Sequence, residues 1–483
     1  MRRSWTVGVV ALLLTAAVAH AQRPAFDIVI RGGRVIDAAS HLDALRDVGI
    51  RGGKVAAISA TPLQGRTVID AHGLVVSAGF IDLHAHGQDD ENYRVFALDG
   101  VTTALELEAG TADVPAFYAT REGKALINYG ASASHIKARM TVMHDGGVAA
   151  GTLLPLDSAG HNVASMEQIA AMRRLIDAGL DAGGLGVGMG LQYTIAATKY
   201  EVLEAFRSAA RRHAPVFVHT RSWGETDPGS SVESFMEVIA ASAITGAPVH
   251  IVHLNSSSLA ATPRTLALIA DARSHGLDVT AEAYPYIAGM TEIASPLLDR
   301  YANGPDSLFS TLMLARTGER LTRATFLANR KPGEVVILFV NTPEMEAMAI
   351  TSPLTAIASD GRIMKGVGHP RAAGTFARVL GYYVRETHQL SLPDALAKMT
   401  LMPARRMEQL APVFRNKGRL KVGADADISV FDPTTVRDRS TYQQPALSST
   451  GFRYVLVNGV LVVRDGVIVE RTFPGRGQRA PVH

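Results

Sequence analysis

Between residues 79 and 360, β-rich runs alternate with Ala-rich runs of helical character, and this alternation constrains the fold more than any other feature. A strand, a helix and a further strand in series favour a parallel sheet, because the helix carries the chain back across it. Eight parallel strands are the number that closes a (β/α)8 barrel. We therefore predict an α/β fold with a TIM-like (β/α)8 barrel. The eight predicted strands are 79–86, 101–108, 128–135, 184–191, 215–219, 248–254, 278–283 and 355–360.

The two ends of the chain have a different pattern, in which short β-rich runs are separated by tight turns. Gly52-Gly53 near one end and Asn458-Gly459 near the other are examples, and such dipeptides are typical of β-hairpins. We expect both ends to form one small β-sandwich beside the barrel, with an insertion where the chain is too long for a single crossover. The predicted divisions are 22–78 and 413–483 for the sandwich, 79–412 for the barrel and about 289–348 for the insertion.

The first 21 residues have the pattern of a secretory signal peptide. Arg2 and Arg3 precede an apolar run at 7–18, and Ala19-His20-Ala21 supplies small residues for cleavage before Gln22. A membrane anchor is the alternative, but the run is shorter than the ~20 residues that a span requires. We expect an exported protein, periplasmic or secreted, without stable membrane insertion after cleavage.

The charge balance restricts the class of partner. Lys and Arg total 48 against 45 Asp and Glu, which gives a formal net charge of +3. A surface so close to neutral has no large field to attract a nucleic acid, so we expect a small-molecule partner instead. The sequence does not determine the oligomeric state.

Ionisable residues stand at the carboxyl ends of the predicted strands. His84 and His86 close the first strand, and their i, i+2 spacing places both imidazoles on one face. His219 ends the fifth strand, His253 lies at the end of the sixth, and Asp360 ends the eighth. In a barrel these ends form one rim, where active sites are built. Imidazoles from three strands with a carboxylate predict a divalent metal site.

The second predicted strand carries two carboxylates. Glu106 and Glu108 share one face of the run 103–110, and leucines occupy the other face. Two unpaired carboxylates inside a barrel would be very costly to desolvate, so a bound cation is the simplest explanation. Glu108 is nearer the rim and is the better candidate ligand. Pairing with an Arg or Lys in the barrel is the alternative, and for Glu106 it is equally plausible.

Several motifs carry a resemblance to a known family. The run Gly79–His86, GFIDLHAH, resembles the metal-binding first strand of the amidohydrolase superfamily, and the run Gly418–Ile428 resembles the return to the sandwich in such chains. Within the superfamily, Ala358–Gly361 and His369–Arg371 resemble the D-aminoacylase (N-acyl-D-amino-acid deacylase) group. The resemblance extends from about residue 26 to residue 468.

This resemblance implies a set of metal ligands. One tightly bound metal would be held by His219, His253 and a ligand from the second strand. A second, weaker position would use His84, His86 and Asp360. The implied cofactor is Zn²⁺ or another divalent metal, as one or two ions.

The resemblance also implies substrate contacts. Arg371 matches the residue that grips the substrate carboxylate, a task that suits a guanidinium with five donors. A structural salt bridge is its alternative role. Tyr193 and Tyr286 are candidate donors to the acyl oxygen, although either would also serve as a packing aromatic.

The chain departs from the group at two informative positions. Ala109, with Glu108 beside it, stands where D-aminoacylases have a cysteine, so a harder carboxylate replaces a thiolate and would be able to bridge two metals. Asn255 stands where the group often has a lysine, which makes Asn255 a candidate substrate contact that differs from the group.

Three further residues have open interpretations. His135 ends the third predicted strand and is either a hydrogen-bond donor at the rim or a core histidine. Strand parity relative to His253 predicts that His250 lies outside the barrel lumen. Lys137 follows the third strand, and we interpret it as a solvated loop lysine rather than a carboxylated metal ligand.

These observations predict a metal-dependent amidohydrolase that cleaves the amide of N-acyl amino acids, with D stereochemistry as one option. A metal-activated water would attack, and Asp360 would act as proton shuttle. A cyclic amide, lactone or dipeptide hydrolase on the same metal site is an alternative. A non-catalytic binding protein on a decayed barrel is an alternative of another class, which the complete set of metal ligands disfavours.

Overall fold

A computed structural model describes Met1 and residues 25–483 of the chain. The predicted signal peptide, residues 1–21, therefore lies almost entirely outside the described residues. Within the described part, no helix combines the length and the apolar character that crossing a membrane requires.

The predicted barrel is confirmed. Eight strands form one parallel sheet in sequence order, from β6 at one edge to β17 at the other. A bridge between Ala85 and Gly361, which follow these two strands, brings the edges together. The strands are β6 (Phe80–Asp82), β7 (Val101–Thr111), β8 (Asn128–Ser134), β9 (Val187–Gly190), β10 (Val216–His219), β11 (Val249–Ile251), β12 (Val279–Ala283) and β17 (Thr355–Ile357).

Seven of the eight strands, all except β7, are shorter than the sequence predicts. Three of these differences bear on candidate histidines. β6 ends at Asp82, so His84 and His86 lie in irregular chain beyond it. β11 ends at Ile251, and His253 follows with a positive φ of 32°. β8 ends at Ser134, which caps the helix that begins at His135. The strand ends are therefore places where the chain turns, and strand parity does not apply beyond them.

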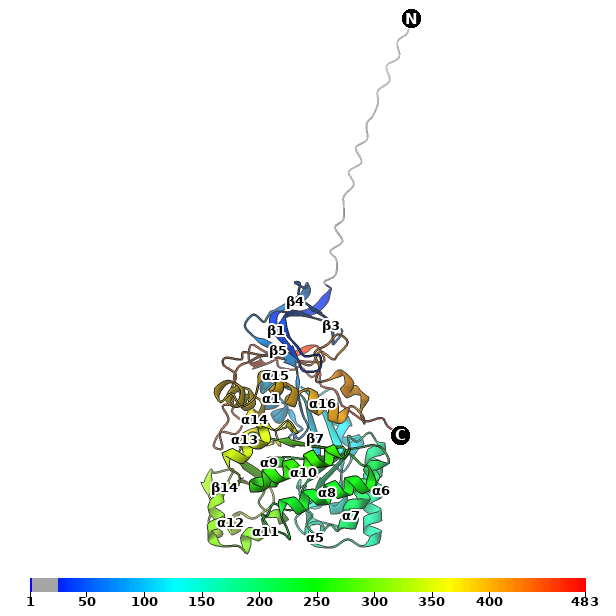
Figure 1. Cartoon of the computed structure of the whole chain (residues 1–483), viewed down its shortest axis with the longest axis vertical. Helices are drawn as coiled ribbons and strands as arrows, with labels where there is room; N and C mark the ends of the chain where they lie inside the picture. The colour runs from blue at the N-terminus through cyan, green and yellow to red at the C-terminus, as the bar shows by residue number, and fades with distance from the viewer. Residues whose placement is uncertain (2–24) are drawn as a thin grey trace.

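Helices cover the barrel, and many of them have a side-chain cap at their start, as α6 and α8 do. In α6 (Met166–Asp181), Ser165 and Gln168 form a reciprocal capping box, and Ile169, Met172 and Ile176 are buried at helical spacing. Figure 1 shows α6, α7, α8 and α10 around the strands. Other helices of this layer are α1 (Asp90–Leu98), α2 (Val114–Ala119), α3 (His135–Val142), α7 (Lys199–Ala210), α8 (Ser231–Thr245), α10 (Thr262–Ser274), α13 (Pro343–Thr351), α14 (Arg371–Arg378), α15 (Leu392–Met399) and α16 (Leu401–Met407).

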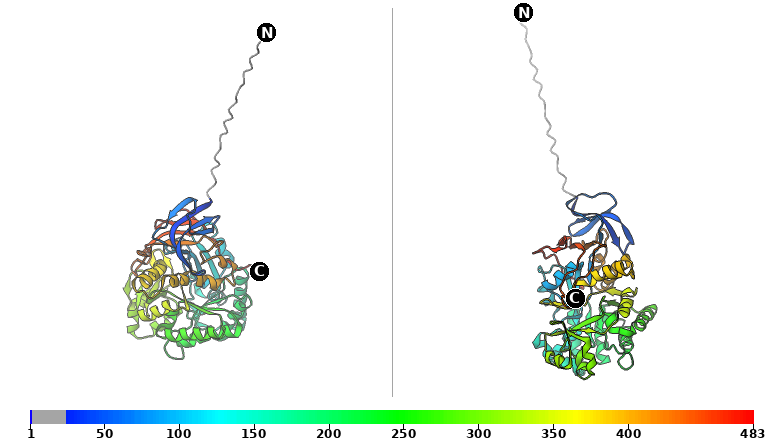
Figure 2. Two further views of the ribbon diagram at one scale, coloured as in Figure 1. Left: turned by 45° about the horizontal axis from the view of Figure 1, so that its top comes forward. Right: turned by 90° about the vertical axis from the view of Figure 1, so that its left-hand side faces the viewer.

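The two ends of the chain meet in one nine-stranded sheet. β5 and β20 join them antiparallel, with Val76 opposite Val430. Apolar side chains from both ends, such as Ile30 and Leu456, pack in one buried cluster. This sheet lies at the top of Figure 1, and Figure 2 shows the same arrangement from two other sides. Its strands are β1 (Phe26–Asp37), β2 (Leu42–Arg51), β3 (Lys54–Ser59), β4 (Gly65–Asp70), β5 (Val75–Ala78), β20 (Ile428–Phe431), β21 (Phe452–Val457), β22 (Val460–Arg464) and β23 (Val467–Ile468).

A second small sheet stands between β12 and β17, in the region of the expected insertion. Its order is β13-β16-β14-β15, and all its pairings are antiparallel. The helix α13 follows it and packs on α10 and β17, as a barrel helix does. We call residues 288–339 the inserted sheet. Its strands are β13 (Ala288–Glu292), β14 (Leu312–Leu314), β15 (Glu319–Arg320) and β16 (Val335–Phe339).

Candidate metal centre

Two groups of side chains that could hold a metal ion share one carboxylate, that of Glu108 on β7. Its Oε2 lies 3.0 Å from Nε2 of His84 and 3.0 Å from Nε2 of His86. Its Oε1 lies 2.8 Å from Nδ1 of His219 and 3.4 Å from Nε2 of His253. Glu108 therefore stands between a pair of histidines that follow β6 and a pair from β10 and the end of β11.

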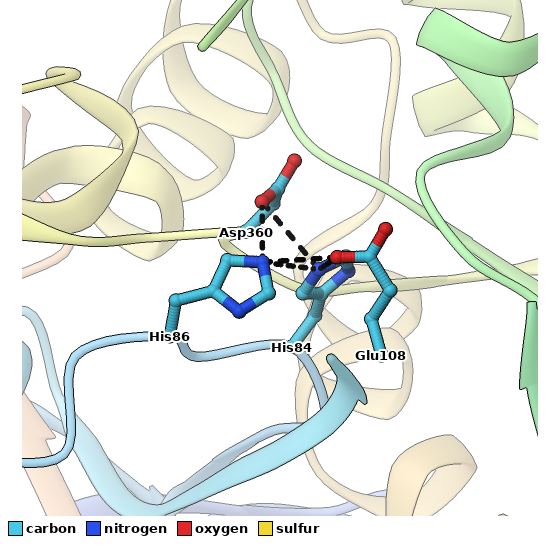
Figure 3. A group of neighbouring side chains, drawn as sticks. All are labelled: His84, His86, Glu108 and Asp360. Carbon is cyan, nitrogen blue, oxygen red and sulfur yellow. Dashed lines mark hydrogen bonds and ion pairs between the residues drawn. The ribbon is translucent and has the colours of Figure 1, made fainter. Parts of the chain in front are cut away.

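Asp360 completes the first group. Its Oδ1 lies 3.4 Å from Nε2 of His84 and 3.3 Å from Nε2 of His86. Figure 3 shows the side chains of His84, His86, Glu108 and Asp360 converging on one point. Asp360 and His253 both have positive φ, of 52° and 32°. Non-glycine residues hold such conformations only where the surroundings impose them, often at functional sites.

The residues fit a divalent cation. Zn²⁺ binds imidazole nitrogen and carboxylate oxygen at about 2.0–2.1 Å in a tetrahedron, which separates neighbouring donors by about 3.3 Å. The separations between Glu108 and its histidines bracket that value. Burial by itself would raise the pKa of Glu108, but the facing imidazoles outweigh it and hold this pKa well below its ordinary value. The shared carboxylate is thus in the ionised form that a cation requires.

Each of the four histidines has a partner for the ring nitrogen that faces away from the donor group. The partner atoms are Oε1 of Glu282 for His84 at 2.6 Å, Oε2 of Glu106 for His86 at 3.0 Å, Oε1 of Gln192 for His219 at 2.6 Å and Oγ of Ser257 for His253 at 3.0 Å. Such contacts fix the tautomer and orientation of a metal-binding imidazole. Glu106 was expected either to bind the cation or to pair with an Arg or Lys. Its carboxylate instead accepts a hydrogen bond from His86.

Four residues at the site were not predicted from the sequence: Asp82, Gln192, Ser257 and Glu282. Asp82 accepts from the backbone N–H groups of His84 and Ser359, each at 3.0 Å, and so ties the chain after β6 to the chain after β17. The charged residue inside strand β12 was a weak signal for Glu282, because its partners come from distant parts of the chain.

The prediction for His250 was wrong. His250 is buried, and its Nε2 lies 3.0 Å from Oε2 of Glu282, whose other oxygen contacts His84. His250 therefore lies on the side of the metal centre and not outside the lumen. Strand parity relative to His253 does not apply to His250, because β11 ends at Ile251 and the chain turns before His253 is reached.

His135 and Lys137 lie apart from both donor groups. His135 is the first residue of α3, is buried, and contacts Oε1 of Glu201 through Nε2 at 2.8 Å, which makes it a core histidine. Lys137 is not the loop residue that we expected, because it lies within α3 and donates to the carbonyl of Thr152.

Arg371, the first residue of α14, connects the metal centre to a cavity. Its Nη2 forms an ion pair with Oδ2 of Asp360 at 2.8 Å, and its side chain is 1% exposed. Its Nε and Nη1 have no hydrogen-bond partner among the described residues. The guanidinium also lies 4.5 Å from the centre of the Tyr284 ring.

Residues of both donor groups and Arg371 line one cavity. Tyr193 also lines it, with its ring 4.7 Å from the ring of His219. Two candidate substrate contacts do not reach it. Tyr286 faces a neighbouring cavity, and its hydroxyl lies 3.4 Å from Asp438. Asn255 donates to the carbonyl of Tyr284 at 3.1 Å, so it supports this segment instead of contacting substrate.

The position of Tyr286 outside the cavity has a local cause. β12 ends at Ala283, and the N–H of Tyr286 donates to the carbonyl of Tyr284 at 3.0 Å, which turns the chain. Tyr284 lines the cavity in its place.

Comparisons with known proteins agree with this geometry. A curated N-acyl-D-glutamate deacylase of Alcaligenes xylosoxydans xylosoxydans is 32% identical over 495 residues, covering 93% of this chain and 96% of that protein. A D-aminoacylase of the same organism is 29% identical over 487 residues, covering 91% and 95%. The solved structure of an N-acyl-D-glutamate deacylase from Bordetella bronchiseptica, complexed with zinc and a phosphonate inhibitor, superposes with a TM-score of 0.79 at 27% identity, covering 94% and 100%. The sequence profile of the amidohydrolase family matches residues 67–325 and 335–463, and the chain belongs to this family.

Proposed function

We propose that this protein is a metal-dependent hydrolase that cleaves the amide bond of N-acyl-D-amino acids. The proposal rests on one cavity, which brings together two donor groups joined by Glu108 and a buried guanidinium. Two nitrogens of that guanidinium, Nε and Nη1, have no hydrogen-bond partner among the described residues. The similar proteins named above, which are deacylases of N-acyl-D-amino acids, support the choice of substrate and of its stereochemistry.

The residues that would hold the metal divide into two positions. His219, His253 and Glu108 would form one, and His84, His86, Asp360 and the other oxygen of Glu108 would form the second. We infer one or two Zn²⁺ ions, as the zinc in the similar solved structure supports. A cation bound there would lower the pKa of water to near neutrality and polarise the scissile carbonyl.

Asp360 is placed to move the proton. Its two oxygens face the donor group and Arg371, and it lines the cavity where the substrate would bind. Burial alone would raise the pKa of Asp360, but Arg371 and the imidazole of His84 outweigh it and lower this pKa. The carboxylate is therefore ionised and is able to accept a proton from the attacking water and pass it to the leaving nitrogen.

Arg371 would orient the substrate. A substrate carboxylate would give its free Nε and Nη1 the acceptors that a buried guanidinium otherwise lacks. Tyr193, on the wall beside His219, would donate to the acyl oxygen. Amide hydrolysis needs these three tasks together: a nucleophile, a proton shuttle and a fixed substrate.

A substrate panel with a metal assay tests the proposal. Purified protein should contain bound zinc and should hydrolyse N-acetyl-D-amino acids, while N-acetyl-L-amino acids and hydantoins should react much more slowly. His219→Asn should lose metal and activity. His135→Asn, which alters a buried histidine outside the donor groups, is the matched control and should retain both. Absence of bound metal, or hydrolysis of hydantoins alone, would contradict the proposal.

We further infer that the protein is exported. The arginine pair, the apolar run at 7–18 and the small residues before Gln22 support this. N-terminal sequencing of protein recovered from the periplasm or the medium should begin at Gln22.

A further inference from the structure

The inserted sheet forms part of the cavity wall. Met290 on β13 and Val335 and Leu338 on β16 line the cavity, and Leu153 and Trp223 line it from the barrel loops. This part of the cavity is predominantly apolar. A substrate bound with its carboxylate on Arg371 and its amide at the metal centre would place a variable group against this wall.

Two charged residues interrupt the apolar wall. Apart from the metal-binding side chains and Arg371, the charged residues that line the cavity in the described part of the chain are Glu292 and Arg362. Oε1 of Glu292, at the end of β13, lies 3.8 Å from Nη1 of Arg362, which follows β17. The two side chains are 10% and 29% exposed. The pair thus joins the inserted sheet to the barrel rim inside the cavity.

Glu292 is held in place from a third side. Its Oε1 also accepts from the backbone N–H of Leu153 at 3.2 Å, and its Oε2 is buried without a hydrogen-bond partner among the described residues. Lys137 is a further cation nearby, but it donates to the carbonyl of Thr152 and does not line the cavity. The negative charge that faces a bound variable group is therefore that of Glu292.

Arg362 and Arg371 have different environments. Arg371 is fully buried, and its two unpartnered nitrogens, Nε and Nη1, suit the carboxylate that every N-acyl amino acid carries. Arg362 is more exposed and lies against Glu292. A substrate with a glutamate or aspartate side chain would bring a second carboxylate to this part of the cavity. The charge of Arg362 is already compensated by Glu292, so the second carboxylate would be repelled by the buried carboxylate of Glu292.

We propose that Glu292 is a specificity-determining residue that neutralises Arg362 inside the cavity, so that the enzyme selects N-acyl-D-amino acids with apolar side chains and rejects acidic ones. The inference rests on the proposed function and names the substrate class of the same site. The inserted sheet supplies this selection, since Glu292 and much of the apolar wall belong to the sheet.

Substitution of one atom tests the proposal. We would measure kcat/KM for N-acetyl-D-leucine and N-acetyl-D-glutamate with the zinc-loaded wild type. Leucine should be preferred by at least ~10²-fold, because rejection rests on an uncompensated buried charge. Glu292→Gln keeps the shape but removes the charge, and it should move the ratio towards glutamate by ~10-fold or more. Adding Arg362→Met to this variant should cancel the gain in kcat/KM for N-acetyl-D-glutamate. A double-mutant cycle would show this coupling.

A matched control separates this effect from a general disturbance of the inserted sheet. Glu334 pairs with Arg316 at 3.3 Å at the start of β16, and neither residue lines the cavity. Glu334→Gln makes the same chemical change in the same sheet and should leave the ratio unchanged. Circular dichroism and thermal unfolding would establish that both variants are folded.

The outcomes are distinguishable. A wild type that prefers glutamate, a measurement that needs no variant, would overturn the inference while leaving the proposed function intact. So would a folded, active Glu292→Gln whose ratio equals that of the wild type. Hydrolysis of neither compound, nor of any other N-acyl-D-amino acid, would overturn the proposed function and this inference with it.

Discussion

Asp360 and Arg371 form an ion pair at 2.8 Å, with both side chains buried and both lining the cavity of the metal centre. The ion pair joins Oδ2 of Asp360 to Nη2 of Arg371. Oδ1 of Asp360 and the other nitrogens of Arg371 are therefore available for other contacts. The second oxygen of Asp360 faces His84 and His86, and the remaining N–H groups of Arg371 have no partner in the described residues. One contact therefore couples the proposed proton shuttle to the proposed carboxylate site.

Replacement of Asp360 by Asn should abolish proton transfer while leaving most of the metal in place. Glu108 and the histidines remain as donors, but the amide cannot accept a proton from water. We expect kcat to fall by ~10²-fold or more, the usual weight of general acid–base catalysis. Steady-state kinetics with parallel metal analysis measures both quantities. Unchanged turnover would remove Asp360 from the mechanism.

Replacement of Arg371 by Ala should act mainly on substrates that carry a carboxylate. We expect a higher KM for N-acetyl-D-leucine, because a charge-assisted hydrogen-bond pair is lost. N-acetyl-D-leucinamide, which is uncharged at this position, provides the comparison and should show a much smaller change. An equal effect on both compounds would indicate that Arg371 acts only through its pair with Asp360.

Replacement of Glu108 by Gln should weaken metal binding at both positions. The side chain is common to the two donor groups, so its charge compensates both cations. Glu106→Gln is the informative comparison, because Glu106 contacts only His86 of the four donor histidines. This variant should reduce metal affinity at one position by about 10–100-fold. Equilibrium dialysis with metal analysis would give the stoichiometry of each variant. Equal losses in the two variants would contradict a bridging role for Glu108.

The buried carboxylate of Glu201 should make stability depend on pH. Burial alone would raise its pKa, but the contacts with His135 and Arg139 outweigh it, so the pKa lies below its ordinary value of 4.5. A lowered pKa means that this stabilisation is complete above pH 4.5 and is lost as the pH falls through the folded-state value. Glu201→Gln should therefore destabilise the protein by about 3–5 kcal/mol at neutral pH, and by progressively less in acid.

Urea denaturation at several pH values measures this difference. Glu167→Gln, at an exposed position in the first turn of α6, is the control and should leave the free energy of unfolding almost unchanged. A difference between Glu201→Gln and wild type that grows as the pH falls would refute the assignment.

Much of the fold was predictable because it depends on local patterns. The alternation of β-rich and helical runs gave all eight barrel strands, and the hairpin dipeptides marked both ends. His84, His86, His219, His253 and Asp360 were found because they stand where strands end, and such ends lie on one rim in any (β/α)8 barrel. Membership of the amidohydrolase family followed from short motifs at the same places.

The partners of these residues were not predictable in the same way. Glu282 contacts His84 across 198 positions of the chain, and Gln192 contacts His219 from a loop after β9. Strand parity failed for His250, because the argument extended β11 beyond Ile251, where it ends. Tyr286 was a candidate donor from the resemblance alone, and the turn after β12 places it beside a neighbouring cavity. Asn255 was assigned to substrate from its place in a motif, although its amide is used by the backbone of Tyr284.

The sequence by itself determined the barrel, the family and the residue types that gather at the rim, because hydrophobic periodicity and short motifs are properties of neighbouring positions. Tertiary structure alone decided that one carboxylate serves both donor groups, that Arg371 has free N–H groups and that Glu292 faces Arg362. These relationships are distances between side chains on separate elements. They are set by how strands end and how the inserted sheet packs over the barrel, which no local pattern encodes.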